Sequence, residues 1–125
     1  MPTNAGIFPP DDGSVIDDTE AIWDKVLDIN LKGVAFSCKF GVPELIKRGG
    51  GSVINIASFT AILGCTVPQD AYATSKGALV SLTFSLAREL ASFGVTVNGI
   101  APAYVRTPMV TEQLNADQRR HFPAG

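Results

Sequence analysis

Short β-branched runs alternate with longer amphipathic stretches along this chain, and their order predicts an α/β fold. The runs at 52–57 and 95–100 have the length and the Val and Ile content of buried strands. The stretches at about 20–48 and 71–92 carry apolar residues at helical spacing. No internal repeat interrupts this order. The pattern therefore predicts one α/β unit in which helices pack on a sheet.

The first helical stretch has a defined start, two weak points and a defined end. The loop 9–18 contains two Pro, a Gly and four Asp, and it leads to Thr19, which we expect to cap the helix. We expect interruptions near Asn30 and at Pro43, where the missing backbone donor should also kink the helix. Gly49–Gly51 then end the helix and lead into the strand.

The second helical stretch is apolar on two sides. One side carries a stripe at helical spacing, formed by Leu79, Leu82, Leu86 and Leu90. Another side carries a second apolar set, formed by Val80, Phe84, Ala87 and Ala91. Helices that are apolar on two faces are usually buried on both. We therefore expect one face to pack on the sheet and the other to pack on a further surface.

Composition and charge argue against several classes of partner. Charged residues make up 18% of the chain and the formal net charge is −2, so no basic footprint for nucleic acid is present. The sequence has no run of about 18 apolar residues and no basic and apolar leader, so we expect neither a membrane span nor a signal peptide. Cys38 and Cys65 could pair, but we interpret them as free thiols in the cytoplasm. His121 has no partner at metal-ligand spacing, so we predict no metal site.

Tyr72 and Lys76 form a candidate proton-transfer pair. They stand four residues apart in a predicted helix, so their side chains share one face. An adjacent positive charge favours the phenolate and lowers a tyrosine pKa from its ordinary value of about 10. Tyr72 is then a candidate general acid or base. For an isolated Tyr-x-x-x-Lys, a chance pairing with a solvated Lys76 is the simpler explanation.

Ser58 is the next candidate. It follows directly on the predicted strand 52–57, at its carboxyl end. In open parallel α/β sheets ligands bind at that edge, so the hydroxyl is placed to meet a substrate oxygen. Alone, a serine at the end of a strand more often caps a helix or belongs to a turn.

Taken together, Ser58, Tyr72 and Lys76 resemble the catalytic signature of the short-chain dehydrogenases/reductases. A further segment, Thr3–Gly6, is similar to the Asn-Asn-Ala-Gly turn of that family, with Thr3 in place of the first Asn. The motifs stand in the family's order and at nearly its separations, which makes an accidental likeness very improbable.

Two longer segments extend the resemblance over nearly the whole chain. The segment 23–33 looks like the family's long helix, in which Asn30 completes a catalytic tetrad. The segment 97–107 looks like the region that packs against the nicotinamide, with Ala103 where Gly is usual. The polar tail 109–125 looks like the beginning of the family's substrate-covering region.

The resemblance implies a Rossmann-like, doubly wound parallel sheet in a three-layer α/β/α fold, of which residues 1–125 form an incomplete domain. The chain matches the second βαβαβ half. A strand followed by a Gly-rich phosphate turn is missing, because Gly49–Gly51 follow a helix and precede a strand. We therefore expect a fragment of a longer protein. Met1-Pro2 is a poor stand-in for the strand expected before the Asn4–Gly6 turn.

The same resemblance assigns a role to each member of the tetrad in hydride transfer between NAD or NADP and a secondary alcohol or ketone. Tyr72 would exchange a proton with the substrate oxygen, and Ser58 would bind that oxygen. Lys76 would lower the Tyr72 pKa and bind the nicotinamide ribose. Asn30 would hold a water through its backbone carbonyl and join Lys76 to solvent.

The implied cofactor contacts come from three segments. Asn4, Ala5 and Gly6 would line the adenosine-side ribose. Pro102, Val105 and Thr107 would hold the carboxamide. The full cofactor set is Asn4, Ala5, Gly6, Tyr72, Lys76, Pro102, Val105 and Thr107. Four residues near the reacting centre suggest a mixed apolar and polar substrate pocket, although each is equally compatible with packing or surface: Phe59, Cys65, Gln69 and Tyr104.

Three hypotheses about function follow. The first is an NAD- or NADP-dependent oxidoreductase that acts on a small-molecule alcohol or ketone, without nucleic-acid or membrane partners, and forms a homo-oligomer through its two long helices. The second is a truncated, catalytically inactive fragment that serves at most as an oligomerisation or binding remnant. The third is a non-enzymatic binding module. An intact set of Asn30, Ser58, Tyr72 and Lys76 weighs against the third.

Overall fold

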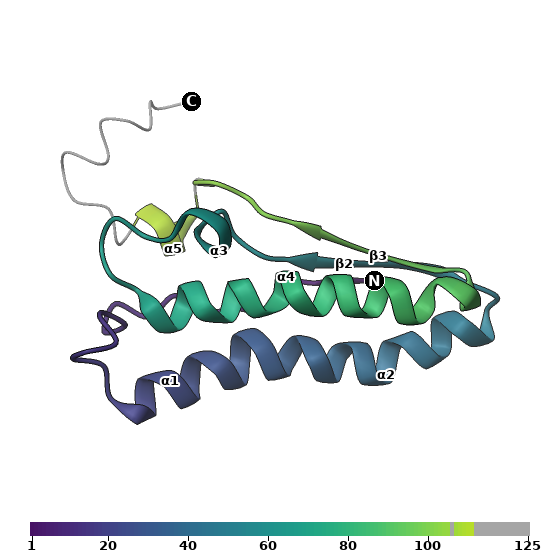
Figure 1. Ribbon diagram of the computed structural model, residues 1–125, viewed down its shortest axis with the longest axis horizontal. Coiled ribbons are helices and arrows are strands. Elements are labelled where there is room, and N and C mark those ends of the chain that lie inside the picture. The colour runs from purple at the N-terminus through teal and green to yellow at the C-terminus, as the bar shows by residue number, and fades with distance from the viewer. Residues whose placement is uncertain (106, 112–125) are drawn as a thin grey trace.

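A computed structural model describes residues 1–105 and 107–111, and it shows a parallel sheet packed against long helices (Figure 1). The sheet has three strands in the order β1 (Pro2–Thr3), β2 (Gly51–Ile56) and β3 (Val95–Ile100). Both strand pairs are parallel, and the register places Val53 opposite Val97. The predicted strands and the incomplete doubly wound α/β fold are thereby confirmed. His121 and all but the start of the tail 109–125 lie outside the described residues.

The helices follow the predicted amphipathic stretches. They are α1 (Glu20–Leu27), the π-helix η1 (Asp28–Lys32), α2 (Gly33–Lys47), α3 (Thr60–Leu63), α4 (Asp70–Leu90), the 3₁₀-helix η2 (Ala91–Phe93) and α5 (Pro108–Thr111). Thr19 caps α1 as predicted, because its hydroxyl accepts from the Ile22 amide at 3.4 Å. The interruption predicted near Asn30 is the π-helical turn, which places an extra residue in the helix at that point.

Pro43 does not interrupt its helix, contrary to the prediction. Helix α2 runs unbroken from Gly33 to Lys47 with Pro43 inside it. A proline removes only one amide donor, whose acceptor would be the carbonyl of Lys39. Both Pro43 and Lys39 are exposed, so that carbonyl can turn toward water while the neighbouring hydrogen bonds of the helix persist.

The start of the chain forms a strand, so the view that Met1-Pro2 is unsuited to one was wrong. Met1 donates its ammonium to the Ser52 carbonyl at 2.6 Å, and its carbonyl accepts from the Ile54 amide at 3.0 Å. Because successive residues of a strand point their amides to opposite sides, the nitrogen of Pro2 faces the free edge of the described sheet. An edge position of this kind is where a sheet tolerates proline.

The predicted loop 58–70 also contains a short helix that the sequence did not show. The amides of Ala61 and Gly64 bond the carbonyls of Ser58 and Thr60 at 3.1 and 3.0 Å. Gly64 then ends α3 with φ of 73°, a conformation that favours glycine. Four residues are too few for an apolar period to be visible in the sequence.

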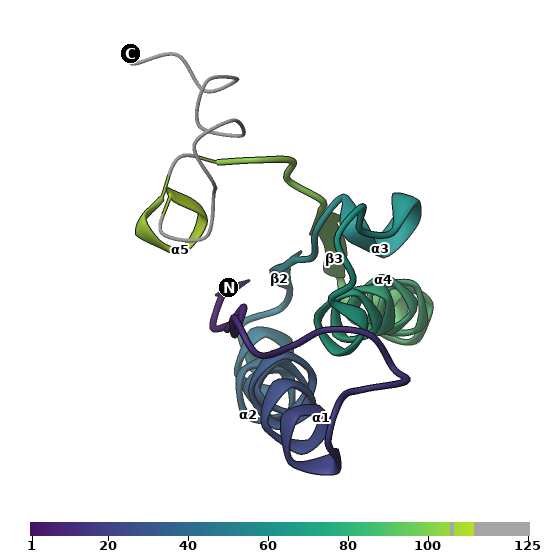
Figure 2. The ribbon, with the colours of Figure 1, turned by 90° about the vertical axis from the view of Figure 1, so that its left-hand side faces the viewer.

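The core lies between the sheet and one layer of helices. Figure 2 shows the long helices α2 and α4 side by side on the same face of the sheet. Leu79 of α4 and Val53 of β2 are fully buried, and Leu90 is nearly so. The described residues thus provide one helical layer of the three-layer fold. The second apolar set of α4 is only partly covered, since Phe84 is 69% exposed.

A chain of buried polar side chains connects two strands of the sheet to helix α4. The Thr3 hydroxyl donates to Asn55 Oδ1 at 2.7 Å, and Asn55 Nδ2 donates to Thr83 Oγ1 at 3.0 Å. Thr83 in turn donates to the Leu79 carbonyl at 2.7 Å. These bonds connect β1, β2 and α4, so they fix the catalytic-site helix relative to the strand ends. Within the described ranges, none of the helices has the length and apolar character needed to cross a membrane.

Candidate active site

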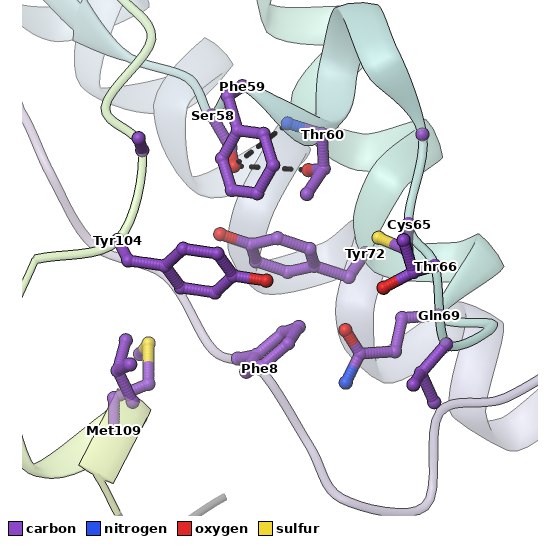
Figure 3. Close-up of a pocket in the computed structure, with 14 residues that line it drawn as sticks. Phe8, Ser58, Phe59, Thr60, Cys65, Thr66, Gln69, Tyr72, Tyr104 and Met109 are labelled. Atoms are coloured by element: carbon purple, nitrogen blue, oxygen red, sulfur yellow. Dashed lines mark hydrogen bonds between the residues drawn. The ribbon is translucent and has the colours of Figure 1, made fainter. Parts of the chain in front are cut away.

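The predicted catalytic residues come together at the carboxyl edge of the sheet. Ser58 follows β2 after one residue, and Tyr72 lies in the first turn of α4. Figure 3 shows the phenol ring of Tyr72 with its hydroxyl turned toward Ser58, whose hydroxyl group lowers the pKa of the phenol. The Ser58 hydroxyl oxygen also accepts from the Thr60 hydroxyl at 3.1 Å. The two hydroxyl groups can therefore contact one substrate oxygen.

The position of Tyr72 is fixed from several sides. Its amide donates to Asp12 Oδ2 at 2.7 Å, and its carbonyl accepts from Ser75 Oγ at 2.7 Å. The ring of Phe8 meets the Tyr72 ring edge-on, with centroids 4.5 Å apart. These contacts leave the phenol little freedom to move away from the strand end.

Lys76 lies one turn further along α4 and is nearly buried. Its ammonium donates to the Ile56 carbonyl at 3.0 Å and lies 5.8 Å from the centre of the Tyr72 ring. Burial lowers the pKa of Lys76 below its ordinary value. The side chain thus presents a hydrogen-bond donor at the end of β2.

The pKa of Tyr72 moves in the opposite direction from the prediction. Burial raises the pKa of Tyr72 above its ordinary value, the bond to Ser58 lowers it and the nearby Cys65 thiol raises it further. The ammonium of Lys76 donates to the Ile56 carbonyl, and desolvation of the phenolate has the largest effect on the Tyr72 pKa. Tyr72 is therefore a protonated phenol at neutral pH in this structure.

Asn30 is fully buried and connects three segments of the site. Its Oδ1 accepts from the Ile7 amide at 2.7 Å, and its Nδ2 donates to the Ile7 carbonyl at 2.9 Å and to Ser75 Oγ at 3.1 Å. The π-helical turn thus places this side chain between the segment after β1 and helix α4. That its backbone carbonyl holds a relay water stays a prediction.

Gly6 lies beside both Asn30 and Lys76. A Cβ atom at this position would lie 3.4 Å from Asn30 Oδ1 and 3.5 Å from Lys76 Nζ. The absence of a side chain leaves room beside the ammonium, as a ligand bound there would require.

Two cavities meet at Ser58 and Tyr72, which line both. The smaller has a volume of about 160 Å³ and is lined by seven of the eight predicted cofactor residues: Asn4, Gly6, Tyr72, Lys76, Pro102, Val105 and Thr107. The eighth, Ala5, is exposed and does not line it. Asn4 and Gly6 therefore line the same cavity as Pro102, Val105 and Thr107, and not a separate cavity for the adenosine-side ribose.

The larger cavity has a volume of about 370 Å³ and includes all four residues suggested for the substrate pocket: Phe59, Cys65, Gln69 and Tyr104. The sequence reasoning missed Phe8, which joins this cavity because Asn30 holds the preceding residue. Thr60 and Thr66 were also missed, and only the loop length between Ser58 and Tyr72 could have indicated them. Figure 3 shows the rings of Phe8, Phe59 and Tyr104 around the phenol of Tyr72.

The fold and the site together define a class of protein. An open parallel α/β sheet with a ligand cavity at the carboxyl ends of its strands is the arrangement used for nucleotide binding. The family model for short chain dehydrogenase matches residues 1–118. The chain therefore belongs to the short-chain dehydrogenase/reductase family, which is a family of oxidoreductases.

Individual relatives agree with this assignment. The chain is 47% identical over 95 residues to dehydrogenase/reductase SDR family member 4 of Oryctolagus cuniculus, covering 76% of this chain and 36% of that protein. It is 40% identical over 111 residues to the 3-oxoacyl-[acyl-carrier-protein] reductase FabG of Thermotoga maritima, covering 89% and 44%. A crystal structure from Burkholderia xenovorans, assigned to the same family, superimposes with a TM-score of 0.84 at 32% identity, covering 90% and 42%. The chain thus spans less than half the length of these relatives.

Proposed function

We propose that this chain carries the catalytic residues of an NAD- or NADP-dependent oxidoreductase that interconverts a secondary alcohol and a ketone. The main support is that Tyr72 and Ser58 line both cavities, with Lys76 in the smaller one. A substrate in the larger cavity can then place its oxygen against both hydroxyl groups. The proposed catalytic set is Asn30, Ser58, Tyr72 and Lys76.

The smaller cavity fits a nicotinamide nucleoside by its chemistry. Lys76 offers a buried cationic donor for ribose hydroxyl groups, and Gly6 leaves space beside it. Asn4 and Thr107 add polar groups, while Pro102 and Val105 add apolar wall. When bound, a nicotinamide cofactor supplies or accepts the hydride.

Tyr72 acts as the proton donor in the direction of ketone reduction. Because burial raises its pKa, the phenol is protonated at neutral pH and can give its proton to the carbonyl oxygen. Ser58 donates a hydrogen bond to the same oxygen and stabilises the charge that develops there. Asn30 holds Ser75 and the segment at Ile7, so it keeps the walls of the site at fixed separation.

The alternative is a catalytically inactive remnant. This sequence contains no Gly-rich turn between a strand and a helix, the usual pyrophosphate site of a dinucleotide fold. A chain that has the nicotinamide part of the cofactor site without the pyrophosphate part would bind the cofactor weakly or not at all. Direct measurement of cofactor binding separates the two proposals.

We expect NADH or NADPH to bind saturably, and Lys76→Met to weaken that binding roughly 10- to 100-fold, since a hydrogen bond from a charged group contributes about 1.5–3 kcal/mol. Methionine keeps the buried stem of the side chain and removes only its cationic donor. Nicotinamide fluorescence follows the titration. Lys47→Met is the matched control, because Lys47 is a surface lysine paired with Glu44 and should leave binding unchanged. A folded chain that shows no saturable binding would support the remnant instead.

The larger cavity favours a neutral substrate. Its walls combine the aromatic rings of Phe8, Phe59 and Tyr104 with the amide of Gln69, and no described lining residue carries a charge. A carboxylate buried there would lose its hydration without gaining an ionic partner. We therefore expect 4-phenyl-2-butanone to bind at least about tenfold more tightly than 4-phenyl-2-oxobutanoate. Saturation-transfer NMR on the cofactor-loaded chain measures both, and equal or reversed affinities would refute a neutral substrate.

We also propose that a second copy of the chain covers the outer faces of α2 and α4. Phe36 and Phe40 of α2 and Phe84 of α4 are 54%, 71% and 69% exposed. Exposed aromatic side chains on neighbouring helices are typical of an interface.

Cys38 and Cys65 are free thiols, which supports the proposal that the protein works in the reducing cytoplasm.

A further inference from the structure

The loop before α1 reaches across the fold to the first turn of α4. Asp12 in this loop is only 4% exposed although it is a carboxylate. Its Oδ1 accepts from the Ala71 amide at 3.2 Å and its Oδ2 accepts from the Tyr72 amide at 2.7 Å. Amides in the first turn of a helix have no partner within the helix, and the N-cap residue Gln69 supplies no side-chain bond. A residue 60 positions away from Tyr72 therefore caps the helix that carries it.

Several further bonds hold this loop in place against α4. The Asp12 amide donates to the Pro9 carbonyl at 3.2 Å, and the Gly13 amide donates to Asp18 Oδ1 at 2.8 Å. In return, the Asp70 amide donates to the Gly13 carbonyl at 2.9 Å. The Asp70 carboxylate also accepts from the Val15 amide at 2.8 Å. The loop and the first turn of α4 are thus bonded reciprocally rather than at one point.

We propose that Asp12 is a positioning residue for Tyr72. By accepting the hydrogen bond from the Tyr72 amide, Asp12 keeps the phenol next to Ser58. Ser75 holds the carbonyl of the same residue, so the backbone of Tyr72 is bonded on both sides. Phe8, four residues before Asp12, contacts the ring itself. The catalytic meaning of this arrangement depends on the proposed oxidoreductase function, whereas the positioning of the phenol does not.

A carboxylate suits this role better than another capping side chain. Both of its oxygens are used, one for each amide, while an asparagine offers only one acceptor. Its negative charge also faces the positive end of the helix dipole of α4. Burial raises the pKa of Asp12, the bonds from the Tyr72 and Ala71 amides lower it, and the neighbouring Asp18 raises it; the net shift is upward, so the loop holds this carboxyl at an energetic cost. A cap that served stability alone could sit at Gln69 without such a cost.

The phenol signal of Tyr72 tests the proposal without any need for turnover. The chain contains two tyrosines, so ¹³Cζ-tyrosine NMR gives two resonances, and a Tyr104→Phe variant assigns them. We expect Asp12→Ala to shift the titration of Tyr72 downward, toward the ordinary midpoint of about 10, because the freed ring becomes solvated. The nuclear Overhauser effect between Phe8 and Tyr72 should be lost.

Controls separate positioning from general loss of structure. Asp11→Ala removes the same charge from the neighbouring exposed residue and should leave the Tyr72 titration unchanged. Asp12→Asn keeps one acceptor and should give an intermediate shift. If Asp12→Ala does not fold, the titration of Tyr72 in Asp12→Asn tests the proposal instead. A folded Asp12→Ala chain with the unaltered Tyr72 titration and the intact Phe8 contact would overturn the proposal.

Hydrogen exchange in the unaltered chain provides a check that needs no substitution. The amides of Ala71 and Tyr72 should exchange much more slowly than free peptide, although they lie in the first turn of a helix. Exchange at the free-peptide rate would also overturn the proposal. Absence of cofactor binding would refute the proposed function but would leave these two measurements unaffected, so the two failures are distinguishable.

Discussion

Replacing Tyr72 by Phe should lower the rate of ketone reduction by about 10²- to 10⁴-fold, the range that a positioned general acid contributes. The substitution removes only the hydroxyl group that points at Ser58 and keeps the ring that packs against Phe8. Cofactor affinity should change little, because the Lys76 ammonium and its bond to the Ile56 carbonyl remain. Absorbance of the reduced nicotinamide follows turnover with 4-phenyl-2-butanone.

The matched control for this substitution is Tyr104→Phe. Tyr104 lines the same cavity as Tyr72, yet it is absent from the smaller cavity where the cofactor is proposed to bind. Its variant should keep most of the turnover. Tyr72→Phe removes only one hydroxyl group and keeps the backbone bonds of residue 72, so both variants should remain folded. Unaltered turnover in Tyr72→Phe would show that another group donates the proton.

If Tyr72 is the proton donor, the rate of ketone reduction by the unaltered chain should depend on pH. Reduction needs the protonated phenol, and burial places the pKa of Tyr72 above its ordinary value of about 10. The rate of reduction should therefore stay level through neutral pH and fall only as pH rises through that raised pKa. Oxidation of the alcohol needs the deprotonated phenol and should become faster over the same range. A reduction rate that already falls near neutral pH would contradict a raised Tyr72 pKa.

The parts of this fold that could be predicted from the sequence are those set by local patterns. The strand 95–100 and the extent of α4 follow from side-chain periodicity, which the backbone geometry of strands and helices imposes directly. The grouping of Ser58 with Tyr72 came from the resemblance of these residues to the signature of the short-chain dehydrogenases/reductases, since each residue alone has a simpler explanation. The weak point at Asn30 was also visible and proved to be the π-helical turn.

The features that sequence reasoning missed depend on contacts between distant segments. Pro2 joins the sheet only because both polar groups of Met1 find partners on β2. The pKa of Tyr72 depends above all on how deeply the phenol is buried, which a spacing of four residues does not determine. The capping of α4 by Asp12 joins residues 60 positions apart, so no local capping pattern could indicate it.

Replacing Leu79 by Ala should lower the free energy of unfolding by about 2–5 kcal/mol, the usual cost of truncating a buried leucine. Leu79 is fully buried between α4 and the sheet, and its carbonyl accepts the bond from Thr83 that ends the buried polar chain. Urea unfolding followed by circular dichroism at low protein concentration measures the effect. Small domains have about 5–15 kcal/mol of stability in total, so this single truncation should remove a large fraction of it.

Phe84→Ala provides the comparison on the same helix. Phe84 is 69% exposed, so its truncation should change the stability of the monomer by no more than about 0.5 kcal/mol. If a second copy covers this face, the variant should instead weaken self-association in sedimentation measurements and lower stability only at high concentration, because association stabilises the folded state by mass action. An equal loss in both variants at low concentration would mean that α4 does not pack on the sheet through its Leu79 side. Unchanged self-association in Phe84→Ala would place any interface between copies elsewhere.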